Sequence, residues 1–325
     1  MQNYTFFCYY LNKRYSFADL FFWKNVKSIV FSTKAGKHFR KSAMKTFQSK
    51  AQINRWVLNQ KSAGKTVGFV PTMGALHEGH LSLIQKAKQQ NDLVVCSIFV
   101  NPIQFNKPED LEKYPRTLEA DMEMLRRNGC DAVFTPSEKE MYPKPEQKVY
   151  DFGILDKIME GRYRRGHFNG VAIVVKKLFE IVQPHRAYFG EKDFQQLQII
   201  KAMVKMESLD VGIVACSTVR EPDGLAMSSR NVRLNKEQRT DASLIHASLK
   251  MAKRLYKTDE ISDIKKRVAE MINASPHLDL EYFEIVWANT LLPVYTKEER
   301  KEEVVGCIAV YAGEIRLIDN MAFNS

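Results

Sequence analysis

Short apolar runs alternate with amphipathic segments from residue 66 onward. The run over residues 93–100, Leu-Val-Val-Cys-Ser-Ile-Phe-Val, is apolar on both faces that a strand presents, which is typical of a parallel strand covered by helices on each side. Strands are expected at 66–70, 93–100, 131–135, 186–189 and 211–219, and helices at 48–60, 79–90, 117–128, 170–182 and 194–207. This alternation predicts an α/β fold built on a doubly wound, Rossmann-like parallel sheet.

The pattern changes after about residue 219. Two helices that carry Lys and Arg are expected at 236–256 and 260–274, followed by strands at 280–287, 304–312 and 315–319. Consecutive strands usually pair antiparallel, because a short connection joins them. We therefore expect a Rossmann-like domain over residues 44–218 and a smaller α+β lid domain over residues 219–325.

The first 43 residues are aromatic and basic but have no clear periodicity. A transit peptide would be rich in Arg, whereas this stretch is mostly Lys and has no small-residue cleavage site after a long apolar region. Met44 offers an alternative start just before the first expected helix. We interpret residues 1–43 as an extension that is either disordered or the product of a mis-assigned start.

The positive charge is concentrated in that extension. The chain has a formal net charge of +11, of which residues 1–43, with eight Lys/Arg and one acid, carry +7. A nucleic-acid-binding protein is expected to carry a basic stripe on its folded domain, whereas the remaining +4 suits a site for small anionic ligands. We therefore expect small-molecule substrates and no nucleic-acid partner.

Cysteine usage and hydropathy indicate a protein of the cytoplasm. The five cysteines have no C-x-x-C spacing, and Cys96, Cys216 and Cys307 lie in strand-like apolar runs, where a thiol behaves as a small hydrophobe. No apolar run reaches 18 residues, so no membrane span is predicted. Both features fit a reducing compartment and no membrane partner.

Two histidines stand at a strand-to-helix turn. Residues 71–80 are Pro-Thr-Met-Gly-Ala-Leu-His-Glu-Gly-His, directly after the first strand and before an amphipathic helix. An open α/β sheet binds ligands at the carboxyl ends of its strands, where a helix N-terminus favours anions. His77 and His80 can therefore donate hydrogen bonds to phosphate oxygens, as an alternative to being ordinary surface histidines. A zinc site would need i, i+4 spacing and a third ligand, so we expect no protein-held metal.

Two further segments carry groups that bind phosphate. Residues 226–231, Ala-Met-Ser-Ser-Arg-Asn, follow a strand and a Pro-Asp-Gly turn, and they bring two hydroxyls and a guanidinium together. In the segment 189–197, Phe-Gly-Glu-Lys-Asp-Phe-Gln-Gln-Leu, Gly190 permits close backbone approach and Lys192 can reach a phosphate. The simpler interpretation of the second segment is a solvated helix start.

Two glutamines follow strands of the same sheet. Gln104 comes after the run that ends at residue 100, and Gln196 lies in the helix after Asp193. Two amides that face one pocket can hold a small hydroxy acid by its hydroxyl and carboxylate. Each glutamine alone is better explained as a surface residue, so the hypothesis depends on their pairing.

These segments, with Tyr114-Pro-Arg-Thr117 and Gly166-His-Phe168, occur in the order of one family. From about Met44 to the C-terminus the chain resembles the pantothenate synthetase (pantoate–β-alanine ligase) family of the HxGH-type nucleotidylyltransferases. A different nucleotidylyltransferase would keep the histidine turn but lack the paired glutamines. A nucleic-acid-binding protein would depend on the basic extension instead.

The resemblance implies a two-step reaction. ATP with Mg²⁺ and (R)-pantoate give pantoyl adenylate and pyrophosphate, and β-alanine then gives pantothenate and AMP, with no organic prosthetic group. A homodimer is expected. The implied catalytic residues are His80, usually labelled a proton donor, His77 and Lys192. The implied ATP-binding residues are Met73, Gly74, Ala75, Leu76, His77, Glu78, Gly79, His80, Gly190, Glu191, Lys192, Asp193, Val219, Met227, Ser228, Ser229 and Arg230.

The resemblance also assigns the acid substrates. Gln104 and Gln196 would bind pantoate, and Gln104 would border the β-alanine path as well. Many relatives have Pro where Arg165 stands and Arg where Asn169 stands. These two departures leave open how rigid that loop is and whether a cation is needed there.

Overall fold

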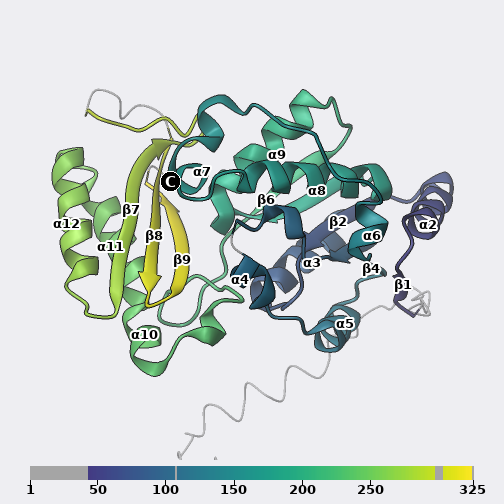
Figure 1. Ribbon diagram of the computed structural model, residues 1–325, viewed down its shortest axis with the longest axis horizontal. Coiled ribbons are helices and arrows are strands. Elements are labelled where there is room, and N and C mark those ends of the chain that lie inside the picture. Colours follow the sequence, from purple (N-terminus) through teal and green to yellow (C-terminus); the bar gives the residue numbers. More distant parts are fainter. Residues whose placement is uncertain (1–42, 107, 297–302, 324–325) are drawn as a thin grey trace, which may run out of the picture. The chain divides into compact units, whose positions relative to one another are not determined.

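Six parallel strands form the larger sheet of the computed structural model, which describes residues 43–106, 108–296 and 303–323 (Figure 1). Their spatial order is β1-β4-β3-β2-β5-β6. Val94, Val95 and Cys96 of β3 are fully buried although they alternate between the two faces, so the prediction of a strand covered on both sides is confirmed. The strands are β1 (Lys45–Phe47), β2 (Val67–Thr72), β3 (Leu93–Ile98), β4 (Ala132–Phe134), β5 (Arg186–Gly190) and β6 (Gly212–Cys216).

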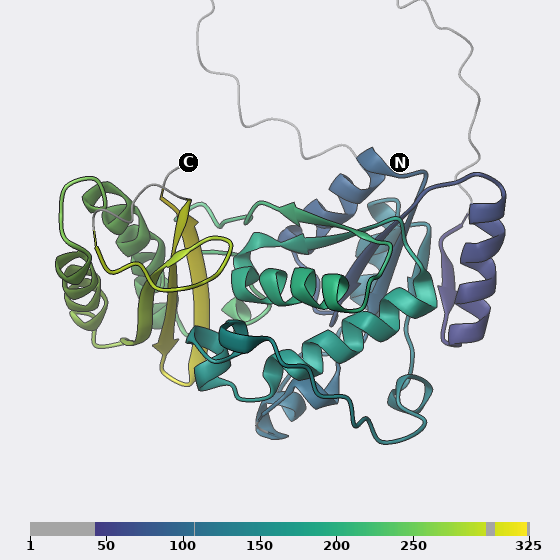
Figure 2. The same ribbon diagram turned by 90° about the horizontal axis from the view of Figure 1, so that it is seen from above.

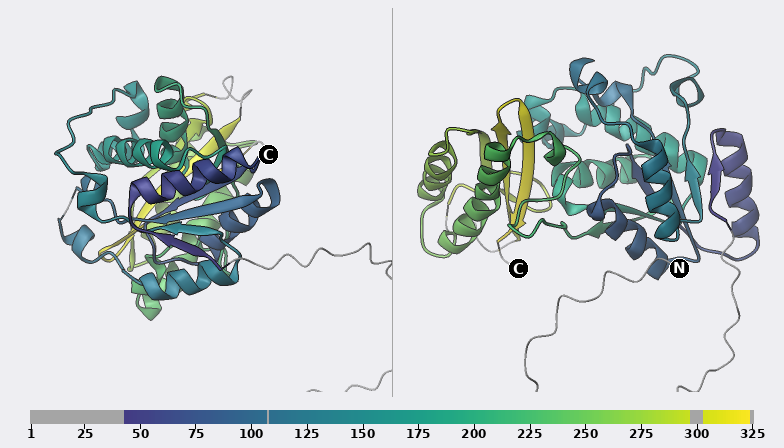
Figure 3. Two further views of the ribbon diagram at one scale, coloured as in Figure 1. Left: turned by 90° about the vertical axis from the view of Figure 1, so that its right-hand side faces the viewer. Right: turned by 90° about the horizontal axis from the view of Figure 1, so that it is seen from below.

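Helices cover both faces of this sheet. One face packs against α2 (Lys50–Ser62), α8 (His167–Val182) and α9 (Phe194–Met206), and the other packs against α3 (Glu78–Gln90) and α5 (Leu118–Arg127). In the left view of Figure 3 the purple helix α2 lies across the strands. Separate apolar clusters fill the two layers. The predicted doubly wound α/β architecture is therefore confirmed.

The strand order creates a crevice between β2 and β5. The chain runs from β2 to β3 and β4 on one side, then crosses to β5 and β6 on the other. Helices leave opposite faces at such a switch point, so the carboxyl ends of the two central strands border an open space. The segments after Thr72 and Gly190 meet at this space.

Short helices interrupt the loops of the described part of the chain. They are η2 (Pro102–Gln104), α4 (Pro108–Glu112), α6 (Glu138–Met141), η3 (Gly153–Asp156), α7 (Met159–Tyr163), η4 (Glu191–Asp193) and η5 (Asn231–Arg233). Helix α8 approaches η2 through a glycine: a Cβ on Gly170 would lie 2.5 Å from the carbonyl oxygen of Ile103 and 2.7 Å from the Cα of Gln104. Only a glycine permits that backbone-to-backbone contact.

The C-terminal part contains the second sheet. Its antiparallel strands are β7 (Leu278–Trp287), β8 (Val304–Ala312) and β9 (Ile315–Ala322), and its helices are α10 (Lys236–Asp241), α11 (Ser243–Leu255) and α12 (Ile261–Asn273). Helices α11 and α12 cover one face (Figure 2), and β9 contacts η4, the short helix that follows β5. The predicted α+β character is confirmed. The boundary at residue 219 stays a prediction, because Ala43–Ser325 form one compact unit.

One expected helix is divided. The pattern over 236–256 predicts a single helix, but α10 ends at Asp241 and α11 begins at Ser243. The Asp241 carboxylate accepts hydrogen bonds from the Ser275 hydroxyl and the His277 ring, and the Ser243 hydroxyl donates to the carbonyl of Thr240. A Ser hydroxyl that bonds a nearby main-chain carbonyl in this way competes with the helical backbone.

Several strand predictions need correction. The central strand β3 ends at Ile98 rather than at residue 100. β6 ends at Cys216 rather than at residue 219, because its partner β5 ends opposite it at Gly190. β9 continues past residue 319 to Ala322. The three-residue strand β1 is absent from the prediction, since so short an edge strand leaves no alternating pattern.

The predictions about membrane spans and cysteines can be compared with the structure only for the described residues. None of the helices in the described part of the chain is long and apolar enough to cross a membrane. The described cysteines, Cys96, Cys130, Cys216 and Cys307, are free and buried, as expected for small hydrophobes. Burial raises the pKa of the Cys130 thiol to about 12. The extension over residues 1–42 and Cys8 lie outside the described residues, so their predictions stay untested.

Candidate active site

A cavity at the carboxyl ends of β2 and β5 brings most of the predicted site residues together. The lining includes both glutamines, Gln104 and Gln196, and the following members of the predicted ATP site: Met73, His77, Gly79, His80, Gly190, Lys192, Asp193, Val219, Met227, Ser228, Ser229 and Arg230. Five predicted residues are not among the described residues that line it: Gly74, Ala75, Leu76, Glu78 and Glu191.

His77 and His80 cap the N-terminus of α3 together. The His77 ring accepts a hydrogen bond through Nδ1 from the Gly79 amide at 3.2 Å, and the His80 ring accepts one through Nδ1 from the His77 amide at 3.3 Å. The ring centroids are 4.1 Å apart. Because both Nδ1 atoms accept, each neutral ring carries its proton on Nε2, which leaves two N–H donors for a ligand.

Both rings are neutral at physiological pH. Burial lowers the pKa of His77 to about 4, with the nearby Lys192 lowering it further. Burial also lowers the pKa of His80 to about 3, and neighbouring His77 acts in the same direction. The pair therefore offers hydrogen bonds to an anion rather than positive charge.

A carboxylate fixes the turn before the histidines. Gly74 and Ala75 have φ values of +84° and +50°, and the amides of Ala75 and Leu76 donate to the Asp121 carboxylate at 2.9 and 2.8 Å. These two amides are thus occupied, so the residues shape the turn from behind the cavity. Sequence reasoning missed Asp121. Its only signal is an acid at a buried position of the amphipathic helix α5.

The Lys192 loop is held by the second sheet. The Asn320 amide nitrogen on β9 donates to the carbonyls of Glu191 and Lys192, each at 2.8 Å. The Lys192 side chain lines the cavity with its Nζ 3.6 Å from the Asp193 carboxylate. Sequence reasoning missed Asn320, which lay beyond the expected end of the last strand.

A hairpin carries the two serines and the arginine. It closes with a hydrogen bond from the Met227 amide to the Val219 carbonyl at 3.0 Å and with a bridge between Arg220 and Ala226. The Ser228 hydroxyl accepts from the Arg230 amide at 3.2 Å. The hairpin thereby turns residues 228–230 toward the cavity, as expected for a phosphate clamp.

Gln104 is oriented by polar neighbours that sequence reasoning did not assign. Its Oε1 accepts from the Asn101 amide at 3.1 Å, and Asn101 in turn accepts from the Tyr142 hydroxyl at 2.7 Å. The Gln104 amide nitrogen faces the Met73 sulfur at 3.1 Å, a weak acceptor that a ligand oxygen can replace. Asn101 directly follows the strand expected over residues 93–100, which was its only signal.

The two adjacent glutamines of α9 have different surroundings. Gln195 is buried and makes three hydrogen bonds, donating to the carbonyls of Leu155 and Ile158 and accepting from the Glu160 amide. Gln196 lines the cavity instead. The pantoate-binding role expected of Gln196 stays a prediction.

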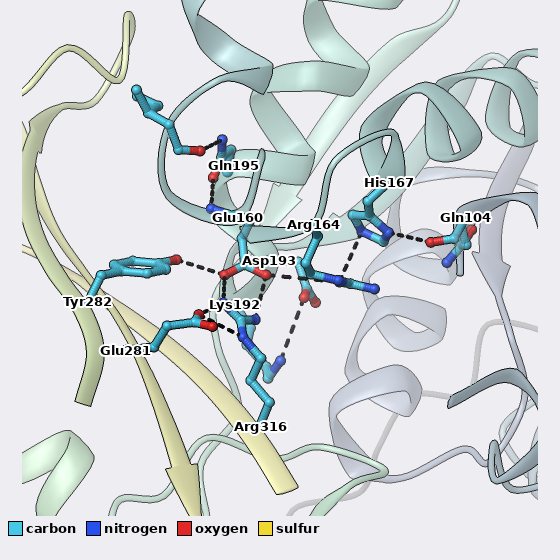
Figure 4. Close-up of polar contacts among 11 residues, drawn as sticks. Gln104, Glu160, Arg164, His167, Lys192, Asp193, Gln195, Glu281, Tyr282 and Arg316 are labelled. Carbon is cyan, nitrogen blue, oxygen red and sulfur yellow. Dashed lines mark hydrogen bonds and ion pairs between the residues drawn. The ribbon is translucent and has the colours of Figure 1, made fainter. Parts of the chain in front are cut away.

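A second cavity adjoins the first and shares several lining residues with it, Lys192, Gln196 and Arg230 among them. A buried ionic network crosses its wall (Figure 4). Arg316 of β9 donates to both carboxylate oxygens of Glu160 at 2.6 and 2.7 Å, and the Tyr282 hydroxyl donates to the same carboxylate at 2.8 Å. Burial alone would raise the pKa of Glu160, but the bonds from Arg316 hold it below its usual value.

The network continues to the loop that holds Gln104. Arg164 lies 3.9 Å from Glu160, and its guanidinium contacts the His167 ring at 3.2 Å. The other ring nitrogen of His167 meets the Gln104 carbonyl at 2.8 Å (Figure 4). Burial lowers the pKa of His167 to about 3, so its neutral ring links the second sheet to the glutamine loop.

One of the two departures from the family pattern has a structural role here. The Asn169 side chain accepts from the Tyr150 amide at 2.9 Å and donates to the Lys148 carbonyl at 3.0 Å, so it fastens the preceding loop. At Arg165 the main-chain carbonyl, which any residue would present, accepts a hydrogen bond from the Asn106 side chain. The Asn169 side chain therefore holds this loop, whereas no contact described here depends on the Arg165 side chain.

The donor set of the cavity fits a phosphate-bound metal better than a protein-held one. Within residues 43–106, 108–296 and 303–323 no three or more His, Cys, Asp or Glu side chains gather as a metal cage. Mg²⁺ usually keeps several waters and binds substrate phosphates together with one or two carboxylates. Asp193 lines the cavity and is a carboxylate that can contact such a hydrated ion.

Comparisons with known proteins identify the family of the chain. A sequence model of the family described as "Pantoate-beta-alanine ligase" matches residues 45–322. Pantothenate synthetase of Porphyromonas gingivalis is 50% identical over 280 residues, which cover 86% of this chain and 99% of that protein. Pantothenate synthetase of Bacteroides fragilis is 52% identical over 263 residues, which cover 81% of this chain and 93% of that protein.

Solved structures give the same result. The crystal structure of pantothenate synthetase from Thermus thermophilus superposes with a TM-score of 0.80 at 41% identity, covering 86% of this chain and 99% of that one. Pantoate-beta-alanine ligase from Francisella tularensis, complexed with beta-gamma ATP and beta-alanine, superposes with a TM-score of 0.72 at 35% identity, covering 87% and 99%. By sequence and by fold, the chain belongs to the pantoate–β-alanine ligase family.

Proposed function

We propose that the cavity between β2 and β5 catalyses the ATP-dependent condensation of (R)-pantoate with β-alanine in two steps. A pantoate carboxylate oxygen bonds to the α-phosphorus of ATP and pyrophosphate leaves. The β-alanine nitrogen then bonds to the activated acyl carbon, loses a proton, and AMP leaves. One observation carries the proposal: phosphate-type donors and the paired glutamines line the same cavity.

The first step calls for charge stabilisation more than proton transfer. The pantoate carboxylate attacks without losing a proton, so the site has to neutralise charge that develops on the phosphates. The Nε2–H groups of His77 and His80, the Nζ of Lys192 and the groups of residues 228–230 supply donors around the cavity. We assign His77, His80 and Lys192 as the catalytic residues on this basis. The low pKa of His80 supports a hydrogen-bonding role rather than that of a proton donor.

ATP is the substrate that fits the larger part of the lining. The N-terminus of α3 places the positive end of a helix dipole at the cavity, which favours a polyphosphate. We propose that residues 73–80, 190–193, Val219 and 227–230 surround the nucleotide. Gly74, Ala75, Leu76, Glu78 and Glu191 would act by shaping these backbone segments, since their side chains do not line the cavity.

Pantoate would bind between the two glutamines. The contact of Gln104 with Asn101 fixes its amide so that the NH₂ group faces the cavity, where it meets only a weak acceptor. Gln196 approaches from α9. A hydroxyl and a carboxylate on one small acid match two amide groups that each donate and accept. Gln104 would also border the path of β-alanine to the adenylate.

Three further features belong to the proposal. Mg²⁺ would enter with the ATP phosphates, which it would help to neutralise, and Asp193 would contact its hydration shell. We also propose a homodimer, which light scattering of the purified protein would test.

The buried free cysteines support a place in the cytoplasm, where thiols remain reduced.

An assay of AMP release with ATP, pantoate and β-alanine tests the function. AMP should form only when all three are present, while pantoate and ATP alone should give trapped pantoyl adenylate or positional isotope exchange in ATP. Complete turnover without either partial reaction would disprove the two-step mechanism. Nucleotide-dependent thermal stabilisation that pantoate does not change would instead favour a different nucleotidylyltransferase.

A further inference from the structure

We propose that Asp319 and Asn320, adjacent residues of β9, are positioning residues that set the spacing of two phosphate-binding loops. Asn320 holds the loop that carries Lys192, and Asp319 holds the hairpin that carries residues 228–230. Neither side chain belongs to the substrate-binding residues assigned above. The inference rests on the proposed role of Lys192 at the ATP phosphates.

Asn320 fixes the main chain of the lysine itself. Its amide nitrogen donates to the carbonyl of Lys192 and to that of the preceding Glu191, both at 2.8 Å, and the side chain is buried. The 3-10 helix η4 that holds these residues is only three residues long. Few internal bonds define the conformation of so short a helix, so a donor from outside determines where the Lys192 Cα lies.

Asp319 fixes the base of the hairpin through Arg220. Its two carboxylate oxygens accept from the guanidinium at 2.6 and 3.1 Å, and the same guanidinium donates to the carbonyls of Gly224 and Asn320. The Asp319 side chain is only 1% exposed, so solvent does not weaken the pair. A bidentate fork of this kind defines orientation as well as distance. Arg220 pairs with Ala226, two residues before Ser228.

The two contacts come from one rigid element. Asp319 pairs with Ile308 and Asn320 pairs with Cys307, both in the buried strand β8. The main-chain N–H of Asn320 donates to the Asp319 carboxylate at 2.7 Å. Consecutive residues of a single strand therefore hold both the loop after β5 and the hairpin after β6. The second sheet thus determines the distance between Lys192 and the hydroxyls and guanidinium of residues 228–230.

A purely structural role would make these contacts ordinary links between two layers. That role predicts loss of stability without a specific loss of rate. A positioning role predicts that removing Asn320 lowers the rate of adenylation through Lys192, because misplacing a reacting group by about 1 Å costs about 100-fold. The two roles are separated by a double-mutant cycle.

The experiment measures the kcat of AMP formation, KM for ATP and for pantoate, and Tm in the full chain. Asn320→Ala should lower kcat by about 10- to 100-fold, with KM for pantoate nearly unchanged. In a Lys192→Ala background the same change should cost almost nothing more. Asn320→Ser, which keeps one donor for one carbonyl, should lose less and guards against a misfolded alanine variant. Asp319→Asn should raise KM for ATP, since the hairpin loses its charged anchor.

Asn54→Ala is the matched control. The Asn54 amide also donates to a main-chain carbonyl of a distant element, that of Ile181 at 2.8 Å, away from the cavity. This control should lower Tm with little change in kcat. The positioning role is wrong if Asn320→Ala lowers Tm but not kcat, as the control does. It is also wrong if Asn320→Ala lowers kcat by the same factor in the Lys192→Ala background as in the wild-type chain. If Lys192→Ala itself retains the wild-type rate, the assigned role of Lys192 fails first and the inference with it.

Discussion

The active-site cavity has two walls, the histidine wall of His77 and His80 and the opposite wall of Lys192 and residues 228–230. The residues that hold each wall in place differ greatly in their sequence separation from it. His77 and His80 hold each other across three residues at the start of one helix. The Lys192 loop and the hairpin of residues 228–230 are held by Asn320 and Asp319, which lie 128 and 99 residues from their partners Lys192 and Arg220. The contacts between the two histidines are therefore local, although Asp121 also holds the turn before them, whereas the opposite wall is held by contacts from the second sheet.

Substituting each wall in turn gives the largest expected effects. His80→Ala and Lys192→Ala should each lower turnover by about 10²- to 10³-fold, because each removes a donor aimed at developing phosphate charge. Only His80→Ala also removes a hydrogen bond of the capping box at the start of α3, so it should cost about 1 kcal/mol more of unfolding free energy. Rates and urea unfolding of both variants check this difference. A large loss of stability with a modest loss of rate would return either residue to a structural role.

The two neighbouring glutamines of α9 should respond differently. Gln196→Ala and Gln104→Ala should raise KM for pantoate, because an unpaired polar group on the bound acid costs about 1 to 3 kcal/mol. That range corresponds to roughly fivefold to 150-fold. ATP affinity should hardly change. Gln195→Ala serves as the control. It removes three buried hydrogen bonds, so it should lower the stability of the protein rather than raise KM for pantoate. Equal weakening of ATP and pantoate would contradict a separate acid pocket.

Acid should destabilise the protein through its buried histidines. Burial lowers the pKa of His77 to about 4 and those of His80 and His167 to about 3, from an ordinary value of 6.5. As the pH falls below 6.5, the unfolded chain binds protons that the folded chain does not. The unfolding free energy should thus decrease toward about pH 4, by at most about 1.4 kcal/mol per pH unit for each histidine.

Unfolding in urea at about pH 7 and about pH 5 measures this loss, and NMR titration assigns it to individual rings. The structure predicts that the rings of His77 and His80 stay neutral across this range. A ring of either residue that titrates near its ordinary value would show that the histidine wall is more open to solvent than described.

The smallest effect is expected at the N-terminus. A chain that begins at Met44 should retain full activity, because residues 1–43 hold none of the family motifs and strand β1, which pairs with β4, starts at Lys45. Turnover and Tm of the shortened chain, beside the full-length chain, check this. Loss of folding or of turnover in the shortened chain alone would mean that the extension contributes to the enzyme.

Sequence reasoning recovered the histidine wall because its signals are local. The motif at residues 71–80, the strand before it and the helix after it all lie within one short stretch, and Gly190 and Lys192 follow the same strand-to-helix logic. The alternating pattern also predicted the doubly wound sheet and the antiparallel second sheet. The errors were the division of the helix expected over 236–256 and the bounds of several strands, such as the missed β1 and the early end of the last strand.

The supporting residues could not be predicted for the opposite reason. Asp121 looks like an ordinary acid in the first turn of a helix, and its role depends on amides 45 and 46 residues away. Asp319-Asn320 looks like the end of a strand, because buried polar residues are rare without partners. The partners, Arg220 and the carbonyls of Glu191 and Lys192, become visible only in three dimensions.

Because Gly170 lies so close to the Gln104 loop, position 170 should tolerate substitution far less than the side-chain positions around the proposed pantoate pocket. A methyl group at Gly170 would meet main-chain atoms of Ile103 and Gln104, which cannot move aside as a side chain can. Substitutions of side chains around the pocket are free to retune which acid it accepts. Any replacement of Gly170 would instead displace the whole loop, so natural drift or laboratory selection for a new acid substrate has to leave this position unchanged.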